Sequence, residues 1–145
     1  AIGAEPDLLF DLSSMLHEMG AEVAVAVTTT ASPVLECVRT QEVLIGDLED
    51  LEERAKAREC DLLITHSHGR QAASRLKIPF YRAGFPMFDR LGAGHQLSVG
   101  YRGTRDLIFD LANLVIGDRE VNHQPTPDTW RTTDSGLQVV PPQLH

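Results

Sequence analysis

Apolar and polar residues follow two different periods along the first 30 residues of the chain. In segment 5–19 the apolar residues recur every three or four positions, which predicts a helix that ends before Gly20. Pro6 and Asp7 are typical of a helix start. Short apolar runs at 1–4 and 22–27 predict strands on either side of this helix. We expect 1–4 to be only the end of a strand, with its start missing from the sequence.

A second series of elements follows the loop at 28–33. Residues 43–45 predict a strand, and Asp47 is expected to cap a helix whose buried side carries Leu48, Leu51 and Ala55. Further strands are predicted at 62–65 and 78–82, with a short helix around 72–76 between them. Strands that alternate with helices at this interval predict βαβ crossovers. The expected fold class is therefore α/β, with a mainly parallel sheet flanked by helices on both faces.

The last third of the chain begins with an irregular stretch, 84–103, which contains five glycines. A long segment without periodicity inside a compact domain is usually a functional loop. Thr104 is expected to cap a final helix, and the composition changes beyond Gly117, where four of the eight prolines lie. We therefore predict a domain at 1–117 and a polar, Pro/Thr-rich tail at 118–145, extended or disordered unless it packs on something else.

Composition narrows the function classes. The net charge is −8 over 145 residues, which argues against a nucleic-acid partner because phosphate binding requires a basic surface. No apolar run approaches the roughly 20 residues that cross a bilayer, and no basic segment followed by an apolar one opens the chain, so we expect neither a membrane span nor a secretory signal. Two cysteines do not make a disulfide framework. The expected location is the cytoplasm.

Common catalytic signatures are missing, so no catalytic residue is predicted. The sequence lacks a Gly-x-Gly-x-x-Gly fingerprint after a strand, a phosphate-binding loop and a nucleophile elbow. His66 and His68 follow a strand at its carboxyl end, where open α/β sheets bind ligands. No cysteine or carboxylate at ligand spacing completes a metal site there, which favours a loop that contacts a partner. Cys37 and Cys60 cannot supply four cluster ligands, and a buried apolar role is their default.

The segment 85–90 combines large apolar side chains with charged ones. If Phe85 and Phe88 are exposed they form an interface patch, and if they fold over the sheet edge they belong to the core. Both interpretations remain open from the sequence. Asp89 and Arg90 are adjacent and need not pair with each other.

Five spaced motifs together resemble one family, the nitrogenase component 1 superfamily. They are Glu-Pro-Asp at 5–7, Ile-Gly-Asp-Leu at 45–48, Asp-Leu-Leu-Ile-Thr-His-Ser-His-Gly-Arg at 61–70, Gly-Phe-Pro-Met-Phe-Asp-Arg at 84–90 and Gly-Tyr-Arg-Gly-Thr at 100–104. The last two are similar to those of the nitrogenase β subunit. The loop ending at Arg70 and the acidic helix 47–53 resemble the scaffold subunits on which the iron–molybdenum cofactor is built. The resemblance covers residues 1 to about 117.

The resemblance implies a three-layer Rossmann-like fold and a place as the C-terminal of three such domains. It further implies a scaffold subunit that forms a heterotetramer with a NifE-like subunit and on which the nitrogenase iron protein docks. The complex is expected to hold iron–sulfur clusters and the cofactor precursor, whereas this fragment carries none of the family's cluster-binding cysteines and no cofactor of its own. Arg70 matches a basic position on the face where the reductase docks. The candidate partner-binding residues are His66, His68, Arg70, Phe85, Phe88, Arg90 and His95.

Two other readings stay open. The chain could instead be a domain of the nitrogenase β subunit or of a related reductase, and so part of an enzyme. The loops at 28–33 and 66–68 favour the scaffold subunit. A stand-alone nucleotide-binding protein is the third reading, and the missing phosphate loop counts against it.

Overall fold

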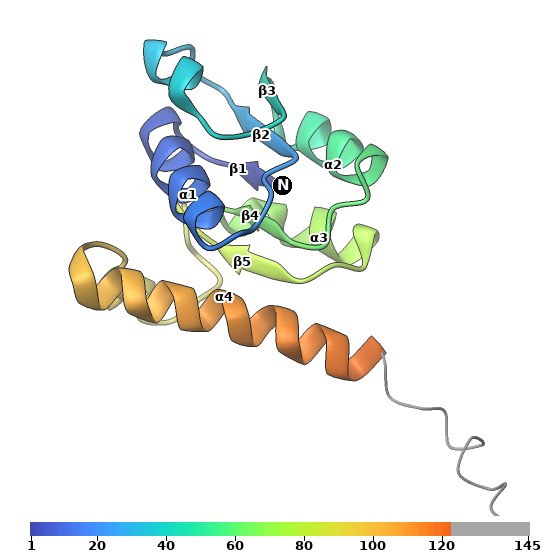
Figure 1. Ribbon diagram of the computed structural model, residues 1–145. Helices are drawn as coiled ribbons and strands as arrows, with labels where there is room; N and C mark the ends of the chain where they lie inside the picture. The colour runs from blue at the N-terminus through green and yellow to red at the C-terminus, as the bar shows by residue number, and fades with distance from the viewer. Residues whose placement is uncertain (123–145) are drawn as a thin grey trace, which may run out of the picture.

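A single five-stranded sheet organises the molecule, and all of its strands are parallel (Figure 1). The computed structural model describes residues 1–122, so most of the predicted tail lies outside the described residues. The strands lie in the order β3-β2-β1-β4-β5. Their bounds are β1 Ile2–Gly3, β2 Val25–Thr28, β3 Glu42–Ile45, β4 Leu63–Thr65 and β5 Phe80–Arg82. The predicted α/β class with a parallel sheet is confirmed.

Helices cover both faces of this sheet, which gives three layers (Figure 1). Because side chains alternate along a strand, Val25 and Val27 pack toward one face while Ala26 between them packs toward the other. The first face is covered by α2 and α3, and the second by α1 and α4. The bounds of the helices are α1 Pro6–Glu18, α2 Leu48–Ala57, α3 Arg70–Leu76 and α4 Gly100–Asn122.

The start of α2 is fixed by a reciprocal capping box, as the sequence predicts. The Asp47 carboxylate accepts hydrogen bonds from the backbone N–H groups of Glu49 and Asp50, at 2.8 and 3.1 Å. The Asp50 carboxylate in turn accepts one from the Asp47 N–H at 3.0 Å. Leu51 and Ala55 are buried on the inner side of this helix, also as predicted.

The boundaries of several elements differ from the prediction. The strand expected at 22–27 covers Val25–Thr28, and the one expected at 78–82 covers Phe80–Arg82. Part of the expected loop at 66–70 is a short 3₁₀ helix, Ser67–Gly69, which runs directly into α3.

The final helix is longer at both ends than expected. It begins at Gly100 rather than Thr104, because the backbone of Ser98 packs against the first turn. A β-carbon on Gly103 would lie 2.8 Å from the Ser98 carbonyl carbon. The helix also continues through Gly117 to Asn122. Within residues 1–122, neither this helix nor any other has the length and apolarity that a bilayer crossing requires.

Candidate functional site

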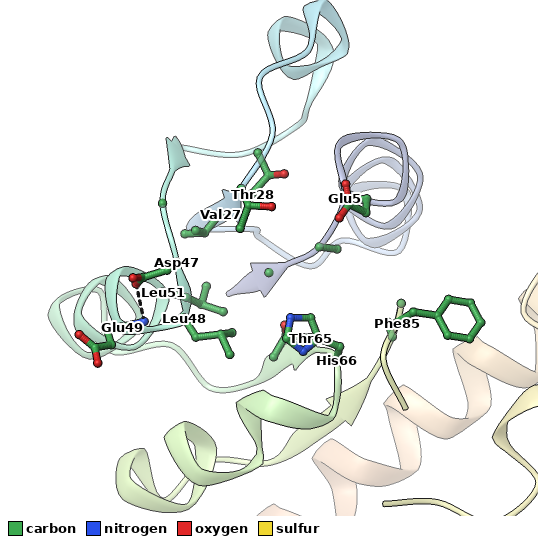
Figure 2. Close-up of a pocket in the computed structure, with 16 residues that line it drawn as sticks. Glu5, Val27, Thr28, Asp47, Leu48, Glu49, Leu51, Thr65, His66 and Phe85 are labelled. Atoms are coloured by element: carbon green, nitrogen blue, oxygen red, sulfur yellow. Dashed lines mark hydrogen bonds between the residues drawn. The ribbon is translucent and has the colours of Figure 1, made fainter. Parts of the chain in front are cut away.

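The carboxyl ends of the parallel strands surround a cavity of about 350 Å³ (Figure 2). After β1 the chain builds β2 and β3 on one side of that strand, and it later adds β4 and β5 on the other. A sheet of this kind leaves a crevice at the strand where its order reverses, and ligands of open α/β sheets bind there. The ends of β1, β2 and β4 line the cavity, together with the residues that follow β3 and β5, the N-cap of α1 and the first turn of α2. We regard this cavity as the candidate functional site.

Two polar atoms at the cavity have no hydrogen-bond partner within the described part of the chain. Thr65 is 0% exposed and its hydroxyl oxygen is unpaired, as is the buried Nδ1 atom of His66. The Thr65 hydroxyl is directed toward Gly3, where a β-carbon would lie 3.1 Å from Oγ1 and 2.5 Å from Leu51 Cδ2. Because buried polar groups are normally paired, these two atoms mark the cavity as a place for another group.

Burial lowers the pKa of the His66 imidazole below its usual value of 6.5, and the charge of His68 lowers it further. The carboxylate of Glu5 opposes this lowering of the pKa. His66 is therefore neutral at pH 7. A neutral imidazole carries one acceptor nitrogen, which a cationic one lacks.

The charged groups around the cavity are all acidic. Glu5, Asp47 and Glu49 line it, and no lysine or arginine within the described part of the chain does. Figure 2 places these carboxylates at the starts of α1 and α2. Asp47 is already engaged with the first amides of α2, as described above. The lining thus has a negative charge that no basic side chain of residues 1–122 neutralises.

A second cluster lies beside the first and is centred on Asp89. Arg82 forms a bidentate pair with this carboxylate, with Nη2 at 2.7 Å from Oδ2 and Nε at 2.9 Å from Oδ1. The Ser67 hydroxyl donates to Asp89 Oδ1 at 2.5 Å and accepts from the Phe88 N–H at 3.2 Å. Arg82, followed by Ser67, holds the pKa of Asp89 far below its usual range. Asp89 therefore pairs with Arg82, and more distantly with Arg70, rather than with its neighbour Arg90.

Ring contacts connect the cavity to the loop that follows β5. The His66 and His68 rings meet edge to face at 5.4 Å between centroids, and His68 meets Phe88 at 4.9 Å. The two histidines therefore contact each other and an aromatic ring. Within residues 1–122 no three His, Cys, Asp or Glu side chains gather in a way that could hold a metal ion.

The loop after β5 exposes most of its large apolar side chains. Phe85 is 85% exposed and Phe88 65%, so neither ring belongs to the core. We call the set that they form with their neighbours the apolar loop surface; its members are Phe85, Phe88, Leu91, Leu97, Val99 and Tyr101. Arg70, Arg90 and His95 are exposed as well, which leaves them open to a partner.

Cys37 differs from the default expectation, whereas Cys60 packs against the core as expected. Cys37 is exposed on the 3₁₀ helix Pro33–Cys37, so it is not a buried apolar residue, and Cys60 is half-buried beside the α2 and α3 core. No residue of that short helix is buried, and this includes Cys37.

Sequence reasoning missed several residues of both clusters. Thr65 is the last residue of β4 and Glu5 directly precedes α1, both at the carboxyl edge of the sheet, and that position is a signal that would have found them. The pair between Arg82 and Asp89 had no such signal, since it depends on how the loop after β5 folds back.

Comparison with known proteins places these features in a family. Residues 1–116 match the family model of nitrogenase component 1 type oxidoreductases. The chain is 77% identical to the nitrogenase iron–molybdenum cofactor biosynthesis protein NifN of Bradyrhizobium diazoefficiens over 140 residues, which is 97% of this chain and 30% of that protein. It is 47% identical to NifN of Rhodobacter capsulatus over 99% of this chain and 30% of that protein.

A solved structure described as nitrogenase Cp1 at pH 6.5 has the same fold. It superposes with a TM-score of 0.72 at 26% identity and covers 97% of this chain and 31% of that one. The chain thus spans about 30% of the length of these curated relatives. The family model covers most of the chain and agrees with the resemblance carried by the five motifs. The chain therefore belongs to the family of nitrogenase component 1 type oxidoreductases.

Proposed function

We propose that this chain is the C-terminal Rossmann-like domain of a NifN-like scaffold subunit. In this proposal the subunit supports assembly of the iron–molybdenum cofactor together with a NifE-like partner. The observation that carries the proposal is the 77% identity to a NifN protein over 97% of the chain. The identity to the solved nitrogenase chain is only 26%, which favours the scaffold subunit over the β subunit of the enzyme.

The described residues do not fit a cluster site. Cys37 is exposed on a short helix and Cys60 is half-buried on a different element, and no third ligand joins either in residues 1–122. Iron–sulfur clusters need several thiolate ligands. The iron–sulfur clusters and the cofactor precursor, which is the cargo of the complex, are therefore assigned to the other domains and to the partner subunit.

The role proposed for this domain is to contact other proteins. The apolar loop surface exposes six large apolar side chains within 17 residues, 85–101, which is typical of an interaction site. Arg90 and His95 lie within the same stretch and are exposed. We propose that this surface, together with His66 and His68, contacts the NifE-like subunit or another domain of the parent chain.

We propose that Arg70 contacts the nitrogenase iron protein, the reductase that docks on the scaffold. Its side chain is 65% exposed, and its Nε lies 4.0 Å from Asp89 Oδ2. That contact orients the guanidinium without covering it. An exposed guanidinium pairs well with carboxylates of a docking partner.

A domain exchange tests the proposed identity. In a Bradyrhizobium diazoefficiens strain whose NifN is deleted, we would express that NifN with its matching segment replaced by residues 1–145. We expect cofactor maturation to be restored, because the exchanged segment is 77% identical. The matched control carries the corresponding segment of a nitrogenase β subunit and is expected to fail. The proposal is wrong if the first chimera assembles with its partner but matures no cofactor.

Two substitutions in the same chimera test the surfaces. Phe88→Ser is expected to weaken co-purification with the NifE-like subunit about tenfold, as loss of an aromatic interface anchor does. Phe10→Ser, on α1, is the control outside the apolar loop surface.

Arg70→Glu is expected to reduce maturation driven by the iron protein, and increasingly so at low salt, where charge contacts count most. Lys56→Glu on α2 is its control; equal effects of Arg70→Glu and Lys56→Glu would remove the assignment of Arg70.

A further inference from the structure

We infer that the cavity at the carboxyl edge of the sheet binds a flat organic cation, an amidinium or guanidinium group carried on an apolar body. This inference is independent of the scaffold role and depends only on the residues that line the cavity. Three properties lead to it: the size and apolar character of the cavity, the sign of its charge, and its unpaired acceptor atoms.

The size of the cavity suits a small group or molecule. Its volume is about 350 Å³, within the range of small-molecule sites. Apolar side chains from both layers form much of its lining, which gives an apolar body a place to pack; they are Ala4, Val27, Leu48, Leu51 and Ala83. Because Gly3 has no side chain, β1 lies close to Leu51 and Thr65, and these three residues form the floor of the cavity.

The charge of the lining selects a cation. Glu5 and Asp47 supply two negative charges at the starts of α1 and α2, whereas Figure 2 shows the Glu49 carboxylate directed away from the cavity; no lysine or arginine among residues 1–122 lines it. The starts of α1 and α2 each contribute only about half a positive charge, so the balance stays near one negative charge. Anion binding at the start of α2 is also blocked, because Asp47 already occupies the N–H groups of Glu49 and Asp50. A phosphate or carboxylate ligand is therefore disfavoured.

The unpaired atoms can accept hydrogen bonds, so a ligand that donates N–H groups would satisfy them. Thr65 Oγ1 and His66 Nδ1 are buried and have no partner within residues 1–122. A hydroxyl accepts hydrogen bonds, and so does a neutral imidazole through one nitrogen. Figure 2 shows the His66 ring among the residues that line the cavity and the Phe85 ring turned away from it. Thr65 and His66 both line the cavity, and each has one unpaired polar atom that an N–H donor could satisfy.

A delocalised cation fits such a site better than a compact one. Guanidinium is more weakly hydrated than ammonium and presents its N–H donors in a fixed, planar array. It therefore loses less hydration on entering a cavity with apolar walls. The group can come from two sources, a free small molecule or an arginine side chain of another domain or subunit.

The test uses three probes of the same shape: benzamidine as cation, benzamide as neutral molecule and benzoate as anion. Binding to the full chain is followed by NMR, with the resonances of Gly3, Thr65 and His66 as reporters. We expect saturable shifts of these resonances with benzamidine and a Kd about tenfold or more below that of benzoate, since carboxylates near the site repel the anion. Equal or tighter binding of benzoate, or shifts confined to residues outside the cavity, would overturn the inference.

A matched pair of variants separates the cavity from general surface charge. Glu5→Gln removes a lining carboxylate and is expected to weaken benzamidine binding several-fold, whereas Glu18→Gln, at the other end of α1, is expected to leave it unchanged. Glu5 makes no side-chain capping bond, so its replacement should not unfold the helix. Thr65→Val is expected to weaken binding as well while preserving the shape of the side chain. Equal effects of Glu5→Gln and Glu18→Gln would contradict the inference.

Repeating the titration in the assembled chimera distinguishes the two sources. Retained benzamidine binding identifies a free molecule as the occupant. Loss of binding, together with an arginine seated in the cavity in the structure of the complex, identifies a protein side chain. A complex in which apolar or acidic side chains fill the cavity would overturn the inference.

Discussion

The cavity edge of the sheet and the apolar loop surface are built in opposite ways. At the cavity edge, Leu51 is 1% exposed and the helix that carries it has a complete capping box. On the apolar loop surface, Leu91 is fully exposed at 106% and Phe85 at 85%. Apolar area stabilises a fold only where it is removed from water. The first region is therefore stabilised by its own contacts, whereas the second has apolar side chains that gain burial only against another protein.

The two regions meet at the loop after β4. Ser67 lies between the cavity residue His66 and the ring of His68, and its hydroxyl binds Asp89 of the apolar loop. Its backbone N–H also donates to the Pro86 carbonyl at 3.0 Å. Asp89 thus fixes one point of a loop that is otherwise largely exposed.

The largest contrast is expected from two leucines. Leu51→Ala should lower the free energy of unfolding by about 2–5 kcal/mol, because it removes buried methyl groups and leaves a void. Leu91→Ala should change it by under about 0.5 kcal/mol, as exposed substitutions do. Urea denaturation of the two variants and the parent chain measures both values.

The comparison between the regions fails if the two leucine variants lose similar stability. A large loss with Leu91→Ala would mean that the loop packs on the domain in solution. In the assembled complex the expectation reverses for Leu91, since its replacement should then weaken the association.

A pair of glycines gives the next largest contrast. A β-carbon on Gly69 would overlap the Thr65 methyl group, Cγ2, whereas one on Gly94 would meet nothing within 4 Å. Gly69→Ala should therefore destabilise the chain by about 1–3 kcal/mol, the usual cost of overpacking. Gly94→Ala should be neutral or slightly stabilising, because it lowers the entropy of the unfolded chain. Thermal unfolding followed by circular dichroism compares them; equal melting temperatures would show that Thr65 moves without cost.

Much of the fold was predictable from local patterns. The strands at 43–45 and 62–65 and the cap at Asp47 depend on residues close in sequence, so periodicity and capping rules found them. The start of α4 was misplaced because it depends on the backbone of Ser98 folding against Gly103.

The candidate site was less predictable, since it depends on residues that only the sheet brings together. His66 was identified from its place after a strand, and it does line the cavity. Glu5 and Thr65 lie 60 residues apart in sequence and meet only because β1 pairs with β4. Likewise, the choice of Arg82 over Arg90 as the partner of Asp89 requires the path of the loop, which no local pattern encodes.

The smallest effect on global stability is expected at Asp89, the point where the apolar loop is fixed. Asp89→Asn weakens the bidentate contact with Arg82, so residues 84–92 should exchange their amide hydrogens faster while the core strands keep their protection. Asp106→Asn, which affects an exposed pair with Arg105 on α4, is the matched control and should leave loop exchange unchanged.

The contribution of Asp89 to the stability of the loop after β5 should decrease as the pH falls. Because Arg82 and Ser67 lower the pKa of Asp89 in the folded chain, the ionised carboxylate is the form that stabilises the loop. This stabilisation is fully present above the usual pKa of 3.8 and is lost as the pH falls below it through the lowered folded pKa. The exchange rates of the parent and of Asp89→Asn, measured from pH 7 downward, should thus differ most at neutral pH and converge only in strong acid. Convergence near pH 5 would mean that a contact other than the ionised Asp89 carboxylate fixes the loop.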